Sequence, residues 1–307
     1  MLDVLGGFLL LGTVVGVGYL LGRWEVLGPD AEVPLSRLSF NVAAPALLFI
    51  TLYDADVRTV LSPASAVAVL TATLTGLLYV VIARRVLGRP GAETVIGALC
   101  ASYVNTNNLG IPLLVLVVGS AAPVAPLLLF QVLVMLPVSL TALDLLTAGK
   151  GSGWRVLLGP VRNPYVLAVL LGLLVSLVGW TPPDVLLDPL EVLGAAAVPL
   201  MLLAFGISLY GAPAPGRGPA RGAVVLAVVL KSVAAPALAL GIGAGILGLG
   251  GVELLTALVL VSLPSAQNIF VHAVRYATSV PLARDAILLS TALSLPVILL
   301  SAALVAT

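Results

Sequence analysis

Two polar runs interrupt long apolar stretches of the sequence, and their residue types are suited to binding a ligand inside a membrane. Amides and hydroxyls donate and accept hydrogen bonds, whereas proline and glycine break helices. In the first run, the candidate ligand-binding residues are Asn105, Thr106, Asn107, Asn108, Gly110 and Pro112. In the second run, they are Pro264, Ser265, Gln267 and Asn268. The pattern predicts two broken helices, the first of them broken near Asn108.

A helix that breaks within hydrocarbon must direct its freed backbone groups toward protein or a water-filled cavity. The N-terminus of a half-helix carries a partial positive charge that suits an anion, and a C-terminus suits a cation. Two broken helices that cross therefore predict a central binding site. The alternative is that the amides only form hydrogen bonds with the backbone groups that kinks leave free in packed helices.

Two ionisable residues lie within apolar stretches. Lys231 follows Arg221 by ten residues, about 15 Å of helix, which places it near the middle of a bilayer. We expect it to bind the substrate as a countercharge, or to act in coupling and gating by titrating in place of a bound cation; a snorkelling or structurally paired lysine is the alternative. His272 lies one turn beyond Asn268 and could sense pH or shuttle a proton, although an interfacial histidine without such a role is the simpler interpretation.

Other residues within the apolar stretches complete the candidate cavity. Gln131 is expected to line it, with an interhelical hydrogen bond as the alternative, and Asn41 is expected beside it. Four-residue glycine spacings predict close helix packing. These glycines are Gly12, Gly16, Gly18 and Gly22, together with Gly241 and Gly245.

The composition excludes several protein classes. Of 307 residues, 61% are hydrophobic and 9% are charged, and the mean hydropathy is +1.21, which is incompatible with a water-soluble domain. The net charge of +1 provides no basic excess for nucleic acid. A single cysteine, Cys100, and a single histidine, His272, exclude an internal disulfide and a multi-histidine metal site. We therefore expect the protein to bind no metal or cofactor and to have no enzymatic activity.

The apolar stretches define ten predicted spans of the roughly 20 residues that a bilayer requires. They cover residues 2–22, 33–52, 64–87, 93–118, 123–147, 160–179, 189–210, 220–248, 253–277 and 281–305. The loops that follow odd-numbered spans hold 12 of the 14 Lys and Arg residues. Because cytoplasmic loops collect these residues, both termini are predicted to face outward.

The chain also contains a weak internal repeat. A shift of 160 residues aligns Glu93 with Glu253, Ser102 with Ser262 and Asn108 with Asn268. Each half, residues 1–148 and 154–307, holds five predicted spans, and an odd number forces the halves into opposite orientations. The predicted fold class is an all-α polytopic membrane protein with two inverted five-helix repeats, whose helices 4 and 9 are broken and cross.

Three segments together resemble the auxin efflux carrier family, specifically its prokaryotic members. They are the run from Asn41 through Pro45 to Phe49, the run from Asn105 to Pro112, and the run from Pro264 to Asn268. The resemblance implies a fold similar to that of the bile-acid sodium symporters. It further implies that spans 1, 2, 6 and 7 form a scaffold and a homodimer surface. Spans 3–5 and 8–10 would then form a transport unit that slides as an elevator.

The resemblance implies a carrier of small organic anions in a prokaryotic inner membrane, with Na⁺ or H⁺ as the candidate coupling ion and potential-driven uniport as an alternative. The long loop between the halves of plant carriers is missing, so auxin itself is not implied. An ion channel and a proton-translocating subunit are the competing functions. An intramembrane protease is disfavoured, because His272 and Asp144 are poor candidates for a catalytic pair.

Overall fold

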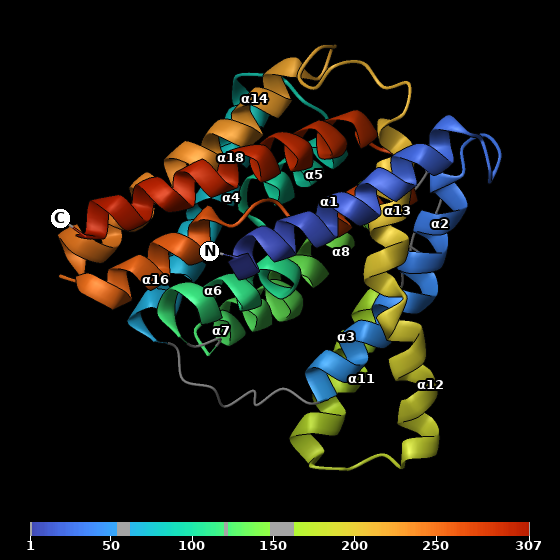
Figure 1. The fold of residues 1–307 in the computed structure, drawn as a ribbon, viewed down its shortest axis with the longest axis horizontal. Coiled ribbons are helices and arrows are strands. Elements are labelled where there is room, and N and C mark those ends of the chain that lie inside the picture. The colour runs from blue at the N-terminus through green and yellow to red at the C-terminus, as the bar shows by residue number, and fades with distance from the viewer. Residues whose placement is uncertain (1, 54–61, 120–121, 148–162, 307) are drawn as a thin grey trace.

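The computed structural model describes residues 2–53, 62–119, 122–147 and 163–306, and these form helices joined by turns and short connections (Figure 1). Six helical segments are long and apolar enough to cross a membrane: Glu32–Tyr53, Pro63–Arg85, Val124–Thr147, Asp184–Leu209, Arg221–Ile246 and Val280–Val305. Four shorter apolar helices accompany them: Leu9–Arg23, Gly91–Ser102, Pro164–Val178 and Gly251–Ser262. The chain is an all-α polytopic membrane protein, as predicted.

The first half of the chain contains α-helices interrupted by short π-helical segments, labelled η. The elements are α1 (Leu2–Arg23), α2 (Glu32–Leu38), η1 (Ser39–Ala43), α3 (Ala44–Tyr53), α4 (Pro63–Arg85), α5 (Gly91–Ser102), η2 (Thr106–Gly110), α6 (Ile111–Val118), α7 (Val124–Phe130), η3 (Gln131–Met135) and α8 (Leu136–Thr147). Local sequence signals set several ends. The Ser62 side chain caps α4 ahead of Pro63, and Gly119 ends α6 in a left-handed conformation.

The second half also contains α-helices interrupted by short π-helical segments. Its elements are α11 (Pro164–Val178), α12 (Asp184–Ala195), α13 (Ala197–Leu209), α14 (Arg221–Val229), η4 (Leu230–Ala234), α15 (Ala235–Leu240), η5 (Gly241–Ile246), α16 (Gly251–Ser262), α17 (Asn268–Arg275) and α18 (Val280–Ala306). Asn163 caps α11 ahead of Pro164, and Gly179 ends that helix in a left-handed conformation. Helices therefore occupy each of the ten predicted ranges, except that residues 160–162 lie outside the described part of the chain.

Both predicted breaks are present, but the first lies earlier in the sequence than expected. Helix α5 ends at Ser102, and the extended residues 103–105 precede η2, which includes Asn108. The prediction of a break near Asn108 was therefore wrong by several residues. The reason is that Pro112 lies in the first turn of α6, where a missing N–H costs no hydrogen bond. In the second break, residues 263–267 separate α16 from α17.

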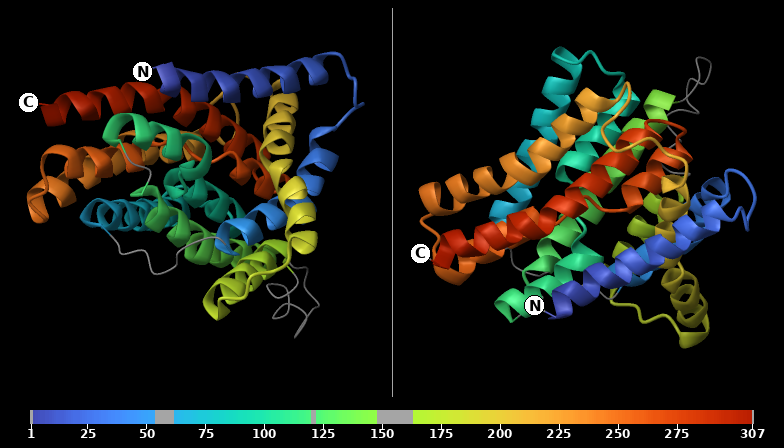
Figure 2. Two further views of the ribbon diagram at one scale, coloured as in Figure 1. Left: turned by 60° about the horizontal axis from the view of Figure 1, so that its bottom comes forward. Right: turned by 45° about the horizontal axis from the view of Figure 1, so that its top comes forward.

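Helix packing divides the described elements into two groups. Helix α1 lies along α13, α3 lies between α11 and α12, and α2 contacts α13; these elements, with η1, are called the first group. The second group holds α4 to α8 and α14 to α18, in which α16 contacts both α4 and α18. Figures 1 and 2 show α12 and α13, in yellow, on the opposite side of the molecule from the orange helices α14 to α16. A division of labour into fixed scaffold and moving unit stays a prediction.

Only some of the regularly spaced glycines contribute to close packing. A Cβ atom on Gly18 would lie 2.5 Å from the carbonyl oxygen of Leu203, and one on Gly206 would collide with the carbonyl oxygen of Val15. Gly22 also approaches α13 closely. At Gly12, Gly16, Gly241 and Gly245 a Cβ atom would meet nothing within 4 Å. The packing interpretation was therefore wrong for those four, because which glycine faces a neighbour depends on helix rotation.

The α1–α13 contact provides a test of this packing. We expect Gly18→Val to lower the thermal unfolding midpoint in detergent, since overpacking costs about 1–3 kcal/mol. Gly12→Val introduces the same side chain on the same helix into open space and should leave the midpoint nearly unchanged. Fluorescence-detected thermal unfolding of both variants would measure this. Equal shifts would contradict the assigned contact.

Candidate functional site

The two breaks meet, and their unwound backbones hydrogen-bond to one another. The Asn105 N–H donates to the carbonyl of Pro264 at 2.9 Å, and the Ala266 N–H donates to the carbonyl of Tyr103 at 3.1 Å. These contacts form an isolated antiparallel bridge between Val104 and Ser265. Segments about 160 residues apart in the sequence thus satisfy backbone groups that apolar surroundings would leave unpaired.

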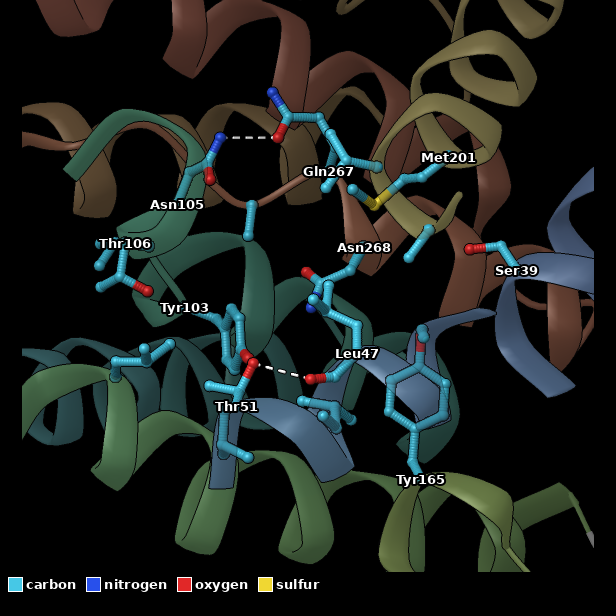
Figure 3. A pocket seen from close by; sticks show the side chains of 18 residues that line it. Ser39, Leu47, Thr51, Tyr103, Asn105, Thr106, Tyr165, Met201, Gln267 and Asn268 are labelled. Atoms are coloured by element: carbon cyan, nitrogen blue, oxygen red, sulfur yellow. Dashed lines mark hydrogen bonds between the residues drawn. The ribbon is translucent and has the colours of Figure 1, made fainter. Parts of the chain in front are cut away.

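Side chains reinforce the crossing from both breaks. The Asn105 amide donates through Nδ2 to Oε1 of Gln267 at 2.7 Å (Figure 3). Gln131 of η3 donates through Nε2 to the carbonyl of Val104 at 3.0 Å and accepts from the Thr106 hydroxyl at 2.9 Å. Gln131 is fully buried. It therefore supports the first break from the side, in the interhelical role considered as its alternative.

Ser265 faces away from the amides and ties the second break to the helices behind it. Its hydroxyl donates to the carbonyl of Cys100 at 2.6 Å and accepts from Ser290 of α18 at 3.1 Å. The backbone N–H of Ser265 also donates to the Ser290 hydroxyl at 3.2 Å. This serine secures the crossing and does not line the cavity beside it.

A cavity of about 100 Å³ lies on one side of the crossing. Figure 3 shows its lining, in which the Asn268 amide is directed into the space beside Tyr103. Its polar or amphipathic lining residues are Ser39, Thr51, Tyr103, Asn105, Thr106, Tyr165, Gln267 and Asn268. The apolar lining residues are Ala44, Leu47, Leu48, Val104, Leu128, Val132, Ala197, Val198, Met201 and Ala266. The wall therefore combines the crossing with elements of the first helix group.

The lining side chains of this cavity are uncharged and carry several hydrogen-bonding groups. The Oδ1 atom of Asn268 is buried without a hydrogen-bond partner in the described structure. Asn268 also begins α17, so the positive end of that helix dipole lies at the cavity wall. The arrangement can hold a small polar or anionic molecule through amide and hydroxyl groups.

Lys231 lies elsewhere, although the sequence predicted it as a substrate contact. It is 3% exposed, and its Nζ atom donates to the carbonyl of Val261 at 2.7 Å, in the last turn of α16. A second, smaller cavity beside it is lined in part by Thr71, Thr75 and Ser102. The two cavities share only Val104 among their described lining residues. The Lys231 side chain therefore ends at the carbonyl end of a half-helix behind the crossing.

The remaining predicted residues whose side chains the structure describes do not contribute those side chains to the larger cavity. Asn41 is exposed, and its amide donates to the carbonyl of Arg37. His272 is buried against aromatic rings, Gly110 packs near Leu263, and Pro264 contributes its carbonyl to the crossing. The side chains of Asn107, Asn108 and Pro112 lie outside the described part of the structure. The described residues contain no group of three or more His, Cys, Asp or Glu that could hold a metal ion.

Sequence reasoning missed the part of the cavity that the first helix group contributes. Ser39, Thr51, Tyr165 and Met201 all line it, yet none lies in a polar run. Tyr103 stands within the first polar run but was not predicted as a ligand. The nearest available signal was the segment from Asn41 to Phe49, whose α3 portion does face the cavity through Ala44, Leu47 and Leu48.

Comparison with known proteins finds one family whose sequence model matches two regions of this chain. The sequence model described as "Membrane transport protein" matches residues 6–154 and, separately, residues 152–301. The chain is 30% identical over 291 residues to an "Uncharacterized transporter" of Methanothermobacter thermautotrophicus, covering 92% of both chains. It is 29% identical over 210 residues to a "Putative malonate transporter" of Rhizobium meliloti, covering 66% of this chain and 64% of that protein.

The amide bond across the crossing can be measured by a double-mutant cycle. We expect Asn105→Ala and Gln267→Ala each to lower thermal stability in detergent. The double variant should lose less than the sum, with a coupling on the order of 1 kcal/mol. A parallel cycle pairing Asn105→Ala with Thr51→Val should be additive, because the Thr51 hydroxyl bonds to Leu47 of its own helix. Additive losses in the first cycle would show that the bond contributes nothing to stability.

Proposed function

We propose that this chain is a secondary carrier of small organic anions. The premise is that the chain belongs to the membrane transport protein family, which includes the auxin efflux carriers. Carboxylates are the substrate class that the site suits best. The protein is an integral membrane protein, and we assign it to a prokaryotic inner membrane with both termini outward. The segregation of Lys and Arg between loops supports that orientation.

The proposed architecture is a pair of inverted five-helix repeats with a moving transport unit. Three observations support it: the family matches each half separately, each half contains one broken helix, and the helices pack as two groups. In this proposal the second group slides against the first and carries substrate bound at the crossing. The apolar, exposed face of α12, which includes Val185 and Val192, is available for a homodimer contact within the membrane.

The cavity at the crossing is the observation that carries the proposal. Amide and hydroxyl groups from both breaks converge there, and the positive end of α17 is suited to an anion. The cavity, of about 100 Å³, offers several amide and hydroxyl groups close together. Such a lining favours compact dicarboxylic acids such as malonate, whose two carboxylates can use these groups, over indole-3-acetate, which has one carboxylate. The name of the Rhizobium relative points to the same class.

Transport by proteoliposomes on a solid-supported membrane tests this function. We expect saturable currents with malonate or malate. The apparent affinity for indole-3-acetate should be at least tenfold weaker, because its single carboxylate can use fewer of the amide and hydroxyl groups that line the cavity. Adding or omitting Na⁺ at two pH values would identify Na⁺, H⁺ or neither as the coupling ion. Currents that never saturate would favour the competing channel, and silence with every acid would contradict the anion site.

A matched pair of variants locates the substrate in the same experiment. Asn268→Leu keeps the branched shape of the side chain but removes the amide, so it should raise the apparent KM for the transported acid at least tenfold. Thr73→Val serves as the control, because the Thr73 hydroxyl bonds only to Val69 of its own helix. An unchanged KM in Asn268→Leu would move the substrate away from this cavity.

Lys231 is proposed to act in coupling or gating and not by touching substrate. Its ammonium group neutralises the C-terminal end of α16 at the second break, as a bound cation would. Thr71 Oγ1 and Ser262 Oγ are buried without partners in the described structure, so nearby hydroxyls could receive the group if it shifted. Movement of this one charge is a means of linking the break to the conformational change.

Replacing Lys231 separates this role from substrate binding. We expect Lys231→Met to abolish transport or uncouple it from ions, while substrate binding, measured by calorimetry, changes less than about threefold. Methionine keeps much of the apolar stem, so folding should survive, and gel filtration in detergent would verify this. Flux at the wild-type rate with unchanged ion dependence would eliminate the proposed role of Lys231.

A further inference from the structure

A cluster of three polar side chains joins distant elements beyond one end of the cavity. The Tyr276 hydroxyl, just after α17, donates to Oδ1 of Asp144 in α8 at 2.8 Å. The Asn163 amide, at the start of α11, donates to Oδ2 of Asp144 at 3.3 Å and to the Tyr276 oxygen at 3.0 Å. Both carboxylate oxygens of Asp144 are therefore hydrogen-bonded by residues far away in the sequence.

Asn163 has a second role that fixes its position. Its Oδ1 atom accepts from the backbone N–H of Tyr165 at 3.1 Å and so caps α11, while its amide nitrogen faces Asp144 and Tyr276. The cap holds the amide at the end of a helix that starts with Pro164. Since both ends of its amide are engaged, Asn163 is a rigid link and not a mobile surface side chain.

An aromatic layer separates this cluster from the cavity. The rings of Phe40 and Tyr165 lie 4.5 Å apart between centroids, and the His272 ring lies edge-on to both, at 5.7 and 5.1 Å. Tyr165 is also part of the cavity wall. The Arg275 guanidinium lies over the rings of Phe40 and Tyr276, 5.5 and 5.7 Å from their centroids. The layer therefore connects the cavity wall at Tyr165 with the Asp144 cluster at Tyr276.

These contacts join the two helix groups at one face of the membrane. Asp144 and Tyr276 belong to the second group, whereas Asn163, Phe40 and Tyr165 belong to the first. Asp144, Asn163, Tyr165 and Tyr276 lie at or near helix ends on the side of the predicted arginine-rich loops, called here the arginine-rich face. Phe40 lies in η1, inside the helical segment that begins on that side at Glu32. His272 has no hydrogen-bond partner on either ring nitrogen within the described structure, so aromatic contacts, not hydrogen bonds, hold it there.

We propose that Asp144, Asn163 and Tyr276 form a latch, which holds the aromatic layer shut and closes the cavity on the arginine-rich face. Sliding of the second group against the first must break the two bonds of Asn163, because they cross between the groups. The inference deepens the proposed carrier function and rests on it, since a latch has a purpose only where substrate leaves by this face. The bond from Tyr276 to Asp144 stays within the second group, and we infer that it keeps the carboxylate oriented toward Asn163.

The latch can be tested by the reactivity of a thiol in the cavity wall. Ser39→Cys places a reporter beside the aromatic layer, in a background where the buried native thiol is removed by Cys100→Ala. A charged, membrane-impermeant methanethiosulfonate is then applied from the arginine-rich face. We expect Tyr276→Phe and Asn163→Ser each to raise the labelling rate at least fivefold. Serine retains the helix cap but cannot reach Asp144, so the second variant spares α11.

The controls distinguish an effect on the latch from misfolding and from an effect on transport. Tyr210→Phe removes an exposed tyrosine hydroxyl outside the cluster and should leave the labelling rate unchanged. Each variant is used only if it elutes as a single species from gel filtration and retains wild-type thermal stability within a few degrees. Rates within twofold of wild type in both latch variants would overturn the proposal. Because the assay needs no transported substrate, silence in the transport experiment would contradict the carrier function without deciding the latch.

Discussion

The structure depends on the hydrogen bonds that two unwound backbone segments form with one another inside an apolar protein. Residues 103–105 and 263–267 leave their helices inside an apolar protein, and each backbone group left unpaired there would cost several kcal/mol. The paired bonds between Asn105 and Pro264, and between Ala266 and Tyr103, remove that cost only when the segments cross. The crossing thereby joins the broken segments of the two halves through an antiparallel bridge.

The remaining polar groups near the crossing divide into those that support it and those that face the cavity. Gln131 and Ser265 direct their hydrogen bonds at the unwound backbone or at the carbonyl of Cys100. Lys231 donates to the carbonyl of Val261, in the last turn of α16 before the second break. Asn268, by contrast, lines the cavity, and its Oδ1 atom has no hydrogen-bond partner in the described structure. A binding site thus requires many more buried polar residues than those that touch its ligand.

The two helix groups meet at contacts of different character. At the cavity, apolar residues of α3 and α13 face the amides of the crossing, and such surfaces can slide without breaking hydrogen bonds. At the arginine-rich face, directional hydrogen bonds and edge-on ring contacts connect the same groups. Apolar contact in the middle and specific contact at one end fit the sliding motion proposed above, because specific contacts would define one of its end states.

The sequence alone determined the membrane class, the ten helical ranges and the presence of two breaks. Apolar length, charge segregation and helix-breaking residues are local properties, readable without knowledge of neighbours. Only the tertiary structure decided which side chains meet. Lys231 bonds to Val261, Gln131 supports a backbone carbonyl, and Ser39 and Met201 face the cavity. The direction of each side chain follows from helix rotation and from packing against segments over a hundred residues away, which no local pattern encodes.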